Sequence, residues 1–263
     1  MLAFPAMSLE IHAVPALTDN YVYVVRDAET GAVAAVDPSL AAPVLALLGT
    51  ADWHLTHVLN THHHWDHTGG NLELKKKTGC IVVGPKADEA RIPGIDIALS
   101  EGETYGFGGA RAEIFDIPGH TRGHIAFYFP ESRALFCGDT LFSLGCGRLF
   151  EGTPAQMWES LCKLRRLPAD TRIYCGHEYT ESNARFALTI DPHNPALQKR
   201  AREAAELRRR GLPTVPAIMD SERAANPFLR ADDPALARAA GIETADPVSV
   251  FAEIRRRKDD FRG

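Results

Sequence analysis

The sequence lacks any hydrophobic run long enough to cross a membrane as a helix, and it starts without the basic region and long apolar core of a secretory signal. It also lacks an excess of positive charge, since its formal net charge at pH 7 is -5. A nucleic-acid-binding domain is expected to carry a clustered basic face instead. We therefore expect neither a membrane nor a nucleic acid among its partners.

Cysteine is scarce and shows no paired spacing. The five cysteines are Cys80, Cys137, Cys146, Cys162 and Cys175. An odd number without a pattern argues against a disulfide framework, which a chain of 263 residues does not need. We expect free thiols, a reducing compartment and a cytoplasmic location, and we read Cys137 as a buried strand residue.

Apolar residues are plentiful, at 45% of the chain, which is enough for one substantial core and a smaller helical appendage. Short apolar segments separated by turns predict strands, which we place at 10–14, 21–26, 32–36, 57–60, 80–83, 111–117, 124–129, 134–137 and 171–174. Helices are expected at 38–49, at 71–78 and from an N-cap at Thr153 to about Leu167. This alternation indicates an α/β domain.

After Thr180 the pattern predicts helices only. Asn194-Pro195, Asp233-Pro234 and Asp246-Pro247 each combine an N-cap residue with a first-turn proline, and glycines at 211 and 241 end the first two segments. We place a domain boundary here, with a first domain at 8–180 and a helical domain at 181–263.

The segment from Thr61 to Asn71, with the sequence THHHWDHTGGN, concentrates potential metal ligands in one turn. Imidazole suits zinc and iron, and a carboxylate can complete the coordination sphere. In the spacing His62-x-His64-x-Asp66-His67, alternate residues point the same way and the last two diverge. One segment can therefore serve two adjacent metals, whereas an accidental histidine tract would lack Asp66 and distant partners.

Distant partners are present in three further turns, each after an apolar strand and beside a glycine. They contain His120 and His124, Asp139, and His177. Glycine permits the sharp turn that a side chain at a crowded strand end requires. We expect His63 to point away from its neighbours, and His124 to orient a ligand or hold the loop in place rather than bind the metal.

These motifs resemble the glyoxalase II (hydroxyacylglutathione hydrolase) family of the metallo-β-lactamase superfamily. The Thr61 to Asn71 motif is common to the superfamily, whereas Cys175 to Thr180 and the basic run Arg255 to Lys258 resemble glyoxalase II in particular. The resemblance begins near Ser8, so residues 1–7 are expected to be a disordered extension. It implies an αββα four-layer sandwich followed by a smaller all-α C-terminal domain.

Carried over by residue, the resemblance implies two divalent metal ions, zinc with iron or manganese as alternatives. It assigns His62, His64 and His120 to one ion, Asp66, His67 and His177 to the other, and Asp139 as the bridge. It also implies hydrolysis of S-(2-hydroxyacyl)glutathione thioesters, chiefly S-D-lactoylglutathione to glutathione and D-lactate, as the second step of methylglyoxal detoxification. Separately, we expect a monomer.

Elementary chemistry agrees with that activity. Two ions about 3.5 to 4 Å apart lower the pKa of a shared water, so that metal-bound hydroxide is the expected nucleophile. Asp66 and Asp139 are the expected catalytic carboxylates, and Asp139 can hold both ions. A thiolate, whose conjugate acid has a pKa of about 8.5, departs without a dedicated proton donor, whereas an amide nitrogen normally needs one. A thioester is therefore the easiest substrate.

Glutathione carries carboxylates, which arginine and lysine bind well. By resemblance, Arg148, Tyr179, Arg255 and Lys258 form the substrate grip. Phe150 also belongs to this site, but it stands where animal members of the family have tyrosine, so one hydroxyl contact is absent. The alternative for Arg255 to Lys258 is a helix end whose cations complement the dipole.

Two other functions compete with this interpretation. A sulfur dioxygenase of the same fold would bind one iron through two histidines and one aspartate, and would not require the C-terminal helical domain. A nucleic-acid-processing or purely binding member would need a basic groove or would have lost ligands, and the sequence shows neither feature.

Overall fold

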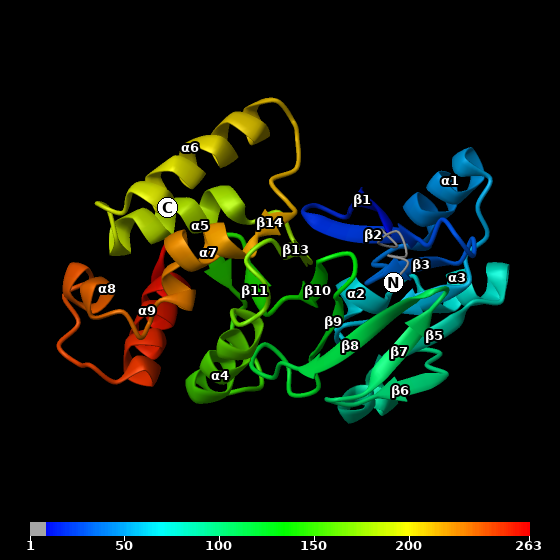
Figure 1. Cartoon of the computed structure of the whole chain (residues 1–263), viewed down its shortest axis with the longest axis horizontal. Helices are drawn as coiled ribbons and strands as arrows, with labels where there is room; N and C mark the ends of the chain where they lie inside the picture. The colour runs from blue at the N-terminus through cyan, green and yellow to red at the C-terminus, as the bar shows by residue number, and fades with distance from the viewer. Residues whose placement is uncertain (1–8) are drawn as a thin grey trace, which may run out of the picture. The chain divides into compact units, whose positions relative to one another are not determined.

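The computed structural model describes residues 9–263 (Figure 1), so the expected extension at 1–7 lies outside the described residues. The chain forms two compact units. The first contains the described residues through Asp116 together with Arg122–Gly138, and the second contains Ile117–Thr121 and Asp139–Gly263. The two units are each made of two segments, whereas the domains expected at 8–180 and 181–263 are each one continuous segment. The expected domain boundary therefore stays a prediction.

The first unit contains ten strands, three α-helices and one 3-10 helix within its described residues. In chain order they are β1 (Glu10–Ala16), β2 (Asn20–Arg26), β3 (Val33–Val36), α1 (Ala41–Ala51), β4 (His57–Leu59), α2 (Trp65–Thr68), α3 (Asn71–Thr78), β5 (Ile81–Pro85), η1 (Lys86–Arg91), β6 (Ile97–Leu99), β7 (Thr104–Phe107), β8 (Ala110–Asp116), β9 (Ile125–Phe129) and β10 (Ala134–Gly138).

Strands β1 to β6 form one sheet in that order. β1, β2 and β3 are antiparallel, whereas β3, β4, β5 and β6 are parallel neighbours, with Val36 opposite Leu59 and Leu59 opposite Val83. The carboxyl ends of the parallel strands therefore meet at one edge. This register brings the turns that follow β3, β4 and β5 together.

Both faces of this sheet are buried, which explains the nearly continuous apolar run of β2. One face, including Val24 and Val58, packs against Val44 and Leu48 of α1 and Leu74 of α3. Alternate residues point to the opposite face, as the two-residue period of a strand requires.

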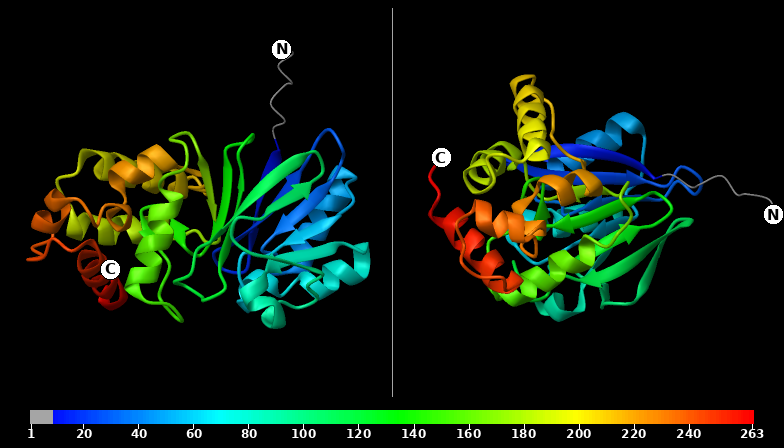
Figure 2. Two further views of the ribbon diagram at one scale, coloured as in Figure 1. Left: turned by 60° about the horizontal axis from the view of Figure 1, so that its bottom comes forward. Right: turned by 60° about the vertical axis from the view of Figure 1, so that its left-hand side comes forward.

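That opposite face meets the strands β7 to β10, which are antiparallel neighbours in the order β10-β9-β8-β7. The Tyr23 ring lies 5.6 Å from Phe136, and the His57 ring lies 5.4 Å from Phe107. The left view of Figure 2 shows the blue-to-cyan strands facing the green strands within this unit. Aromatic rings from both sheets therefore fill the space between them.

The second unit is mostly helical. Its elements are β11 (Leu141–Phe142), β12 (Gly145–Cys146), α4 (Pro154–Leu164), β13 (Arg172–Cys175), α5 (Thr180–Ile190), α6 (Pro195–Arg209), β14 (Ala217–Ile218), α7 (Met219–Ala225), η2 (Pro227–Leu229), α8 (Pro234–Ala239) and α9 (Pro247–Asp260). α5 and α6 run side by side in Figure 1, and α4 packs on α9 through Trp158 and Phe251.

Side-chain caps start four of these helices where the sequence predicts them. Thr153 forms a reciprocal capping box with Gln156 before α4. The carboxylates or amides of Asn194, Asp233 and Asp246 accept backbone N–H groups of the first turns of α6, α8 and α9. The predicted starts of these helices are therefore confirmed.

Other expectations need correction. The region after Thr180 is not helical throughout, because the two-residue strand β14 pairs with β13 there. α1 starts at Ala41 rather than Pro38, because the backbone of Leu40 is extended and forms the N-cap of the helix. The sequence shows no local signal for the start of α5, because its N-cap residue Tyr179 makes no side-chain capping hydrogen bond. The shortest elements also lack a recognisable sequence pattern.

All five cysteines are unbridged, and Cys137 lies buried in β10 as expected. Within residues 9–263, no helix has both the length and the apolar character needed to traverse a bilayer.

Candidate metal centre

The parallel register of the first sheet positions the histidine-rich turn. Strand β4 ends at Leu59, beside the end of β3, so the turn that begins at Asn60 lies next to Asp37. The backbone N–H of Thr61 donates to Asp37 Oδ1 at 2.7 Å, and the Thr61 hydroxyl donates to Asp37 Oδ2 at 2.7 Å. Asp37 thus holds the first residue of the turn at two points.

Asp37 also determines the orientation of His67. His67 Nδ1 lies 3.2 Å from Asp37 Oδ2, and because a carboxylate only accepts, Nδ1 carries the proton. The lone pair is therefore on Nε2, which lies 3.6 Å from Asp66 Oδ2. This tautomer is the one that a metal ligand binding through Nε2 requires.

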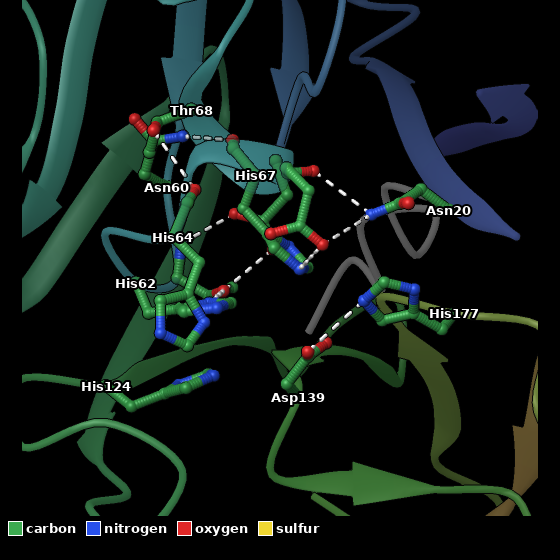
Figure 3. Close-up of polar contacts among 12 residues, drawn as sticks. Asn20, Asn60, His62, His64, His67, Thr68, His124, Asp139 and His177 are labelled. Carbon is green, nitrogen blue, oxygen red and sulfur yellow. Dashed lines mark hydrogen bonds and ion pairs between the residues drawn. The ribbon is translucent and has the colours of Figure 1, made fainter. Parts of the chain in front are cut away.

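The neighbouring residue Thr61 determines the tautomer of His62 in the same way. Its Nδ1 lies 3.0 Å from the Thr61 hydroxyl, which already donates to Asp37 and therefore accepts from His62. The His62 ring stacks on His124 with a centroid distance of 4.5 Å. His62, His64 and His67 project toward one another in Figure 3, and the His62 centroid lies 4.8 Å from His64 and 4.2 Å from His67.

Asp66 is oriented by Asn20 at the start of β2. The Asn20 amide donates to the Asp66 backbone oxygen at 3.1 Å and to its Oδ2 at 3.2 Å (Figure 3). Asn20 is buried, whereas Asp66 is partly exposed. This contact fixes the direction of a carboxylate on the very short helix α2.

The other residues of the turn hold its shape. His63 Nδ1 lies 2.7 Å from Asp88 Oδ2, and its ring centroid lies 4.9 Å from that of His64. The Asn60 amide donates to the His67 carbonyl at 3.0 Å and accepts from Asn71 at 2.7 Å. His124 contributes ring stacking to His62, in agreement with the orienting role expected for it.

In the second unit, two predicted histidine ligands converge on one carboxylate oxygen of a third predicted ligand, Asp139. Asp139 Oδ2 lies 3.4 Å from His120 Nε2 and 3.2 Å from His177 Nε2. All three residues are buried. The contact between Asp139 and His177 is drawn in Figure 3.

A backbone carbonyl orients His120, and an aromatic ring orients His177. His120 Nδ1 lies 2.8 Å from the Arg148 carbonyl, which only accepts, so the lone pair of His120 is on Nε2. His177 stacks on Tyr179, with ring centroids 4.7 Å apart and an interplanar angle of 2°. Gly147 leaves room for Asp139, because a Cβ at position 147 would overlap the Asp139 carbonyl oxygen.

The donors fit divalent metal ions. In the first unit, ligand atoms of Asp37, His62 and His67 lie within 4.8 Å of one another. Asp37 accepts three internal hydrogen bonds, so we assign it to support and the histidines to ligation. Neutral imidazole Nε2 atoms and carboxylate oxygens are the ligands that zinc and iron take in such sites.

Three of the predicted substrate residues lie on the second unit beside its histidines. Phe150 is 61% exposed and its ring centroid lies 5.2 Å from that of His120. Tyr179 is 36% exposed and stacks on His177. Arg148 is exposed, and its Nε lies 3.3 Å from Asp259 Oδ1. These side chains are accessible to a ligand.

Arg255 and Lys258, both on α9, differ from each other. Arg255 is buried; it donates to the Cys146 carbonyl at 2.9 Å and to Asp259 Oδ1 at 3.0 Å. Lys258 is partly exposed and contacts the Ser182 hydroxyl at 3.3 Å. Burial, together with the positive charges of Arg255 and Arg185, lowers the pKa of Lys258 to about 8. Arg255 therefore has an internal structural role that the sequence did not reveal.

Sequence reasoning also missed the residues that support the ligands. Asp37, Asn20 and Asp88 had no predicted role, although Asp37 follows an apolar strand, and functional residues concentrate on such connecting segments. Asp88 lies 25 residues from its partner His63 in the sequence, and Asn20 lies 46 residues from its partner Asp66. No local pattern identifies contacts of that kind.

Comparison with protein families gives two matches that together span most of the chain. Residues 17–177 match the metallo-beta-lactamase superfamily, and residues 178–261 match the hydroxyacylglutathione hydrolase C-terminus. A protein of Methylococcus capsulatus named hydroxyacylglutathione hydrolase is 58% identical over 255 residues, which are 97% of this chain and 100% of that protein.

Solved structures are similar at lower identity. The crystal structure of ETHE1 from Myxococcus xanthus is 23% identical, with a TM-score of 0.67 over 94% of this chain and 90% of that chain. The protein TTHA1623, crystallised in a di-iron-bound form, is 28% identical, with a TM-score of 0.52 over 64% of this chain and 91% of that chain.

Proposed function

Because the chain belongs to the hydroxyacylglutathione hydrolase family of the metallo-β-lactamase superfamily, we propose that it hydrolyses S-(2-hydroxyacyl)glutathione thioesters. The chief substrate would be S-D-lactoylglutathione, giving glutathione and D-lactate in the second step of methylglyoxal detoxification. The observation that carries this proposal is the presence of oriented histidine and aspartate ligands in a chain that matches its relative from end to end.

The chain has the expected metallo-β-lactamase fold with a C-terminal helical domain. We further propose that residues 8–180 form the catalytic domain and 181–263 the helical substrate-binding domain. The two family matches support this division, because one ends at residue 177 and the other begins at residue 178.

Membership in this superfamily implies metal ions. We propose two per chain, zinc with iron or manganese as alternatives, held by His62, His64, His120, Asp66, His67, His177 and the bridging Asp139. The di-iron form of TTHA1623 supports a two-ion count. When bound, the ions would supply an activated water as nucleophile and would polarise the thioester carbonyl.

The protein's own groups prepare this chemistry. Asp37 and the Arg148 carbonyl hold the protons of His67 and His120 on Nδ1, so that Nε2 is the ligand atom. Asn20 keeps the Asp66 carboxylate in a fixed direction. The leaving thiolate is stable enough near neutral pH, with a conjugate-acid pKa of about 8.5, that no separate acid is required.

Substrate recognition would depend on the second unit. We propose that Lys258 and Arg148 bind carboxylates of glutathione, that Tyr179 and Phe150 contact its apolar and peptide portions, and that Arg255 adds positive charge from below the surface. The exposure of the Tyr179 and Phe150 rings, which leaves them accessible to a ligand, supports a contact role. We also propose a monomer in a reducing, cytoplasmic compartment, which the unbridged thiols support.

The test is hydrolysis of S-D-lactoylglutathione by protein of measured metal content. We expect turnover that rises with loading and reaches its maximum at two ions per chain. Full activity with a single ion would contradict the binuclear assignment. Absence of thioester hydrolysis by the fully loaded protein would contradict the substrate.

A further inference from the structure

A buried carboxylate from α7 is attached to the hairpin formed by β11 and β12. Glu222 is fully buried. Its Oε1 accepts from the Ser143 hydroxyl at 2.9 Å, and its Oε2 accepts from the Leu144 backbone N–H at 2.7 Å. Burial raises the pKa of Glu222, and a buried carboxylate is costly unless its oxygens are hydrogen-bonded. Glu222 therefore makes specific contacts with the hairpin turn.

Neighbouring side chains extend this attachment. The buried Asn226 amide donates to Glu222 Oε2 at 3.0 Å and also to the carbonyls of Phe142 at 3.1 Å and Gly145 at 3.0 Å. Asn183 of α5 donates to the Ser143 carbonyl at 3.1 Å. Polar groups from α5, α7 and the turn after α7 thus converge on a hairpin of six residues.

The hairpin and the residues that flank it adjoin all three proposed ligands of the second unit. Asp139 lies two residues before β11, and the Gly147 N–H, which directly follows β12, donates to the Thr140 carbonyl at 3.2 Å. The carbonyl of Arg148, one residue farther, orients His120. The Phe142 ring lies 6.0 Å from the His177 ring. A shift of the hairpin would therefore move Asp139, His120 and His177 together.

We propose that Glu222 and Asn226 are positioning residues for the metal centre, which act through the β11–β12 hairpin to hold these three ligands in their binding geometry. This inference depends on the proposed function, because it takes the three residues to be metal ligands. Neither residue binds the metal or the substrate. Their contribution is to slow the loss of metal, in the way that groups behind a metal ligand usually do.

The experiment compares metal release from zinc-loaded full-length variants into an excess of chelator. Glu222→Met keeps most of the side-chain volume but removes both acceptors, so zinc should leave about tenfold faster, at the lower end of the effect of ligand-orienting groups. Glu222→Gln retains an acceptor for the Leu144 N–H and should restore most of the wild-type rate. Glu206→Gln, an exposed carboxylate on α6 paired with Arg209, is the matched control and should behave as wild type.

Ser143→Ala provides a second measurement if Glu222→Met does not fold. It removes one bond between hairpin and carboxylate, and zinc release should be about threefold faster. The inference would be overturned if zinc left Glu222→Met at the same rate as wild type. If only Ser143→Ala folds, an equal rate of zinc release from that variant and wild type would overturn it. A lower urea midpoint of the metal-free variant without faster release would assign Glu222 to packing alone and would also overturn it.

This result is independent of the substrate. Faster release from the variant, together with no hydrolysis of glutathione thioesters by wild type, would support the positioning role and contradict the proposed reaction. Normal hydrolysis by wild type, together with an unchanged rate of zinc release from the variant, would support the proposed reaction and contradict the positioning role.

Discussion

At the scale of single residues, the protein fixes the rings of three proposed ligands through Nδ1, which leaves Nε2 for the proposed metal. His67 uses Asp37, His120 uses a backbone carbonyl, and His62 uses the Thr61 hydroxyl. Each partner places the proton on Nδ1 before any ion arrives. The entropy and tautomer costs of ligation are thereby met on folding, which increases metal affinity.

Asp139→Asn should reduce metal content more than any single histidine change. Asparagine preserves the shape of the side chain but removes the negative charge that we propose both ions share, so each loses an anionic ligand at once. We expect the loss of both ions together, measured by elemental analysis after gel filtration. A variant that retained two ions and normal turnover would show that Asp139 is not the bridge.

Asp37→Asn tests whether Asp37 supports the proposed metal ligands without binding the metal itself. An amide presents only one acceptor oxygen to three donors from Thr61 and His67, so metal affinity should fall about 10- to 100-fold while the ligands stay unchanged. Competition with a chromophoric chelator measures this affinity. Asp52→Asn, the same change at an exposed position with a left-handed conformation that asparagine tolerates, should leave affinity unaltered. Equal affinities for the two variants would count against the role of Asp37.

At the scale of elements, α9 combines two tasks in its last turns. Arg255 ties the helix to the Cys146 carbonyl, whereas Lys258 lies closer to solvent. Arg255 is therefore held inside the protein by a distant carbonyl, whereas Lys258 remains the residue for which we propose direct substrate binding. Arg255 is poorly suited to a test of binding because its removal leaves a buried carbonyl without its donor.

Lys258 should make substrate binding depend on pH. Its pKa is lowered to about 8 from the ordinary 10.5, so the ammonium loses its proton as the pH rises through about 8. If only the charged form binds carboxylate, KM should increase up to about tenfold between pH 7 and pH 9, with kcat unaffected. Initial rates over a series of substrate concentrations measure both constants.

Lys258→Arg is the informative comparison, because a guanidinium keeps its charge throughout this range. The rise in KM should disappear in that variant. An unchanged rise would assign the pH dependence to another group.

Thr153→Ala tests the start of α4. It removes a reciprocal capping box, so the free energy of unfolding of the second unit should fall by about 1 kcal/mol. The midpoint of urea unfolding, followed by circular dichroism, measures the change. Thr50→Ala, at the exposed end of α1, removes no N-cap and should have a smaller effect; an equal effect would argue against the capping contribution.

At the scale of the whole molecule, no covalent cross-link holds the chain together, since all five cysteines are unbridged. Stability depends on the apolar cores and on whatever binds the folded state. A ligand that binds only the folded protein stabilises it in proportion to the logarithm of its concentration over Kd. Tightly bound metal should therefore contribute strongly.

Chelation should lower the melting temperature and abolish hydrolysis, and added zinc should restore both, whereas a reductant alone should change neither. Differential scanning fluorimetry and the thioester assay on the same samples provide the measurements. A melting temperature that is insensitive to chelator in protein shown to have lost its ions would contradict metal stabilisation of the fold.

The sequence by itself determined the features that depend on near neighbours along the chain. The ligand types in the 61–71 turn, the strands that precede them and the proline-assisted helix starts are all local, because side-chain period, N-cap chemistry and ligand spacing act over a few residues. The resemblance then assigned the distant ligands. The family and the fold were predicted correctly on this basis.

Only the tertiary structure decided which residues support those ligands. Asp37 meets Thr61 across 24 residues, Glu222 meets Leu144 across 78, and Arg255 meets Cys146 across 109. Parallel strand register and helix packing create these contacts, and neither leaves a signal in the short segments involved. The division between buried Arg255 and accessible Lys258, three residues apart on one helix, likewise depends on what packs against each side of α9.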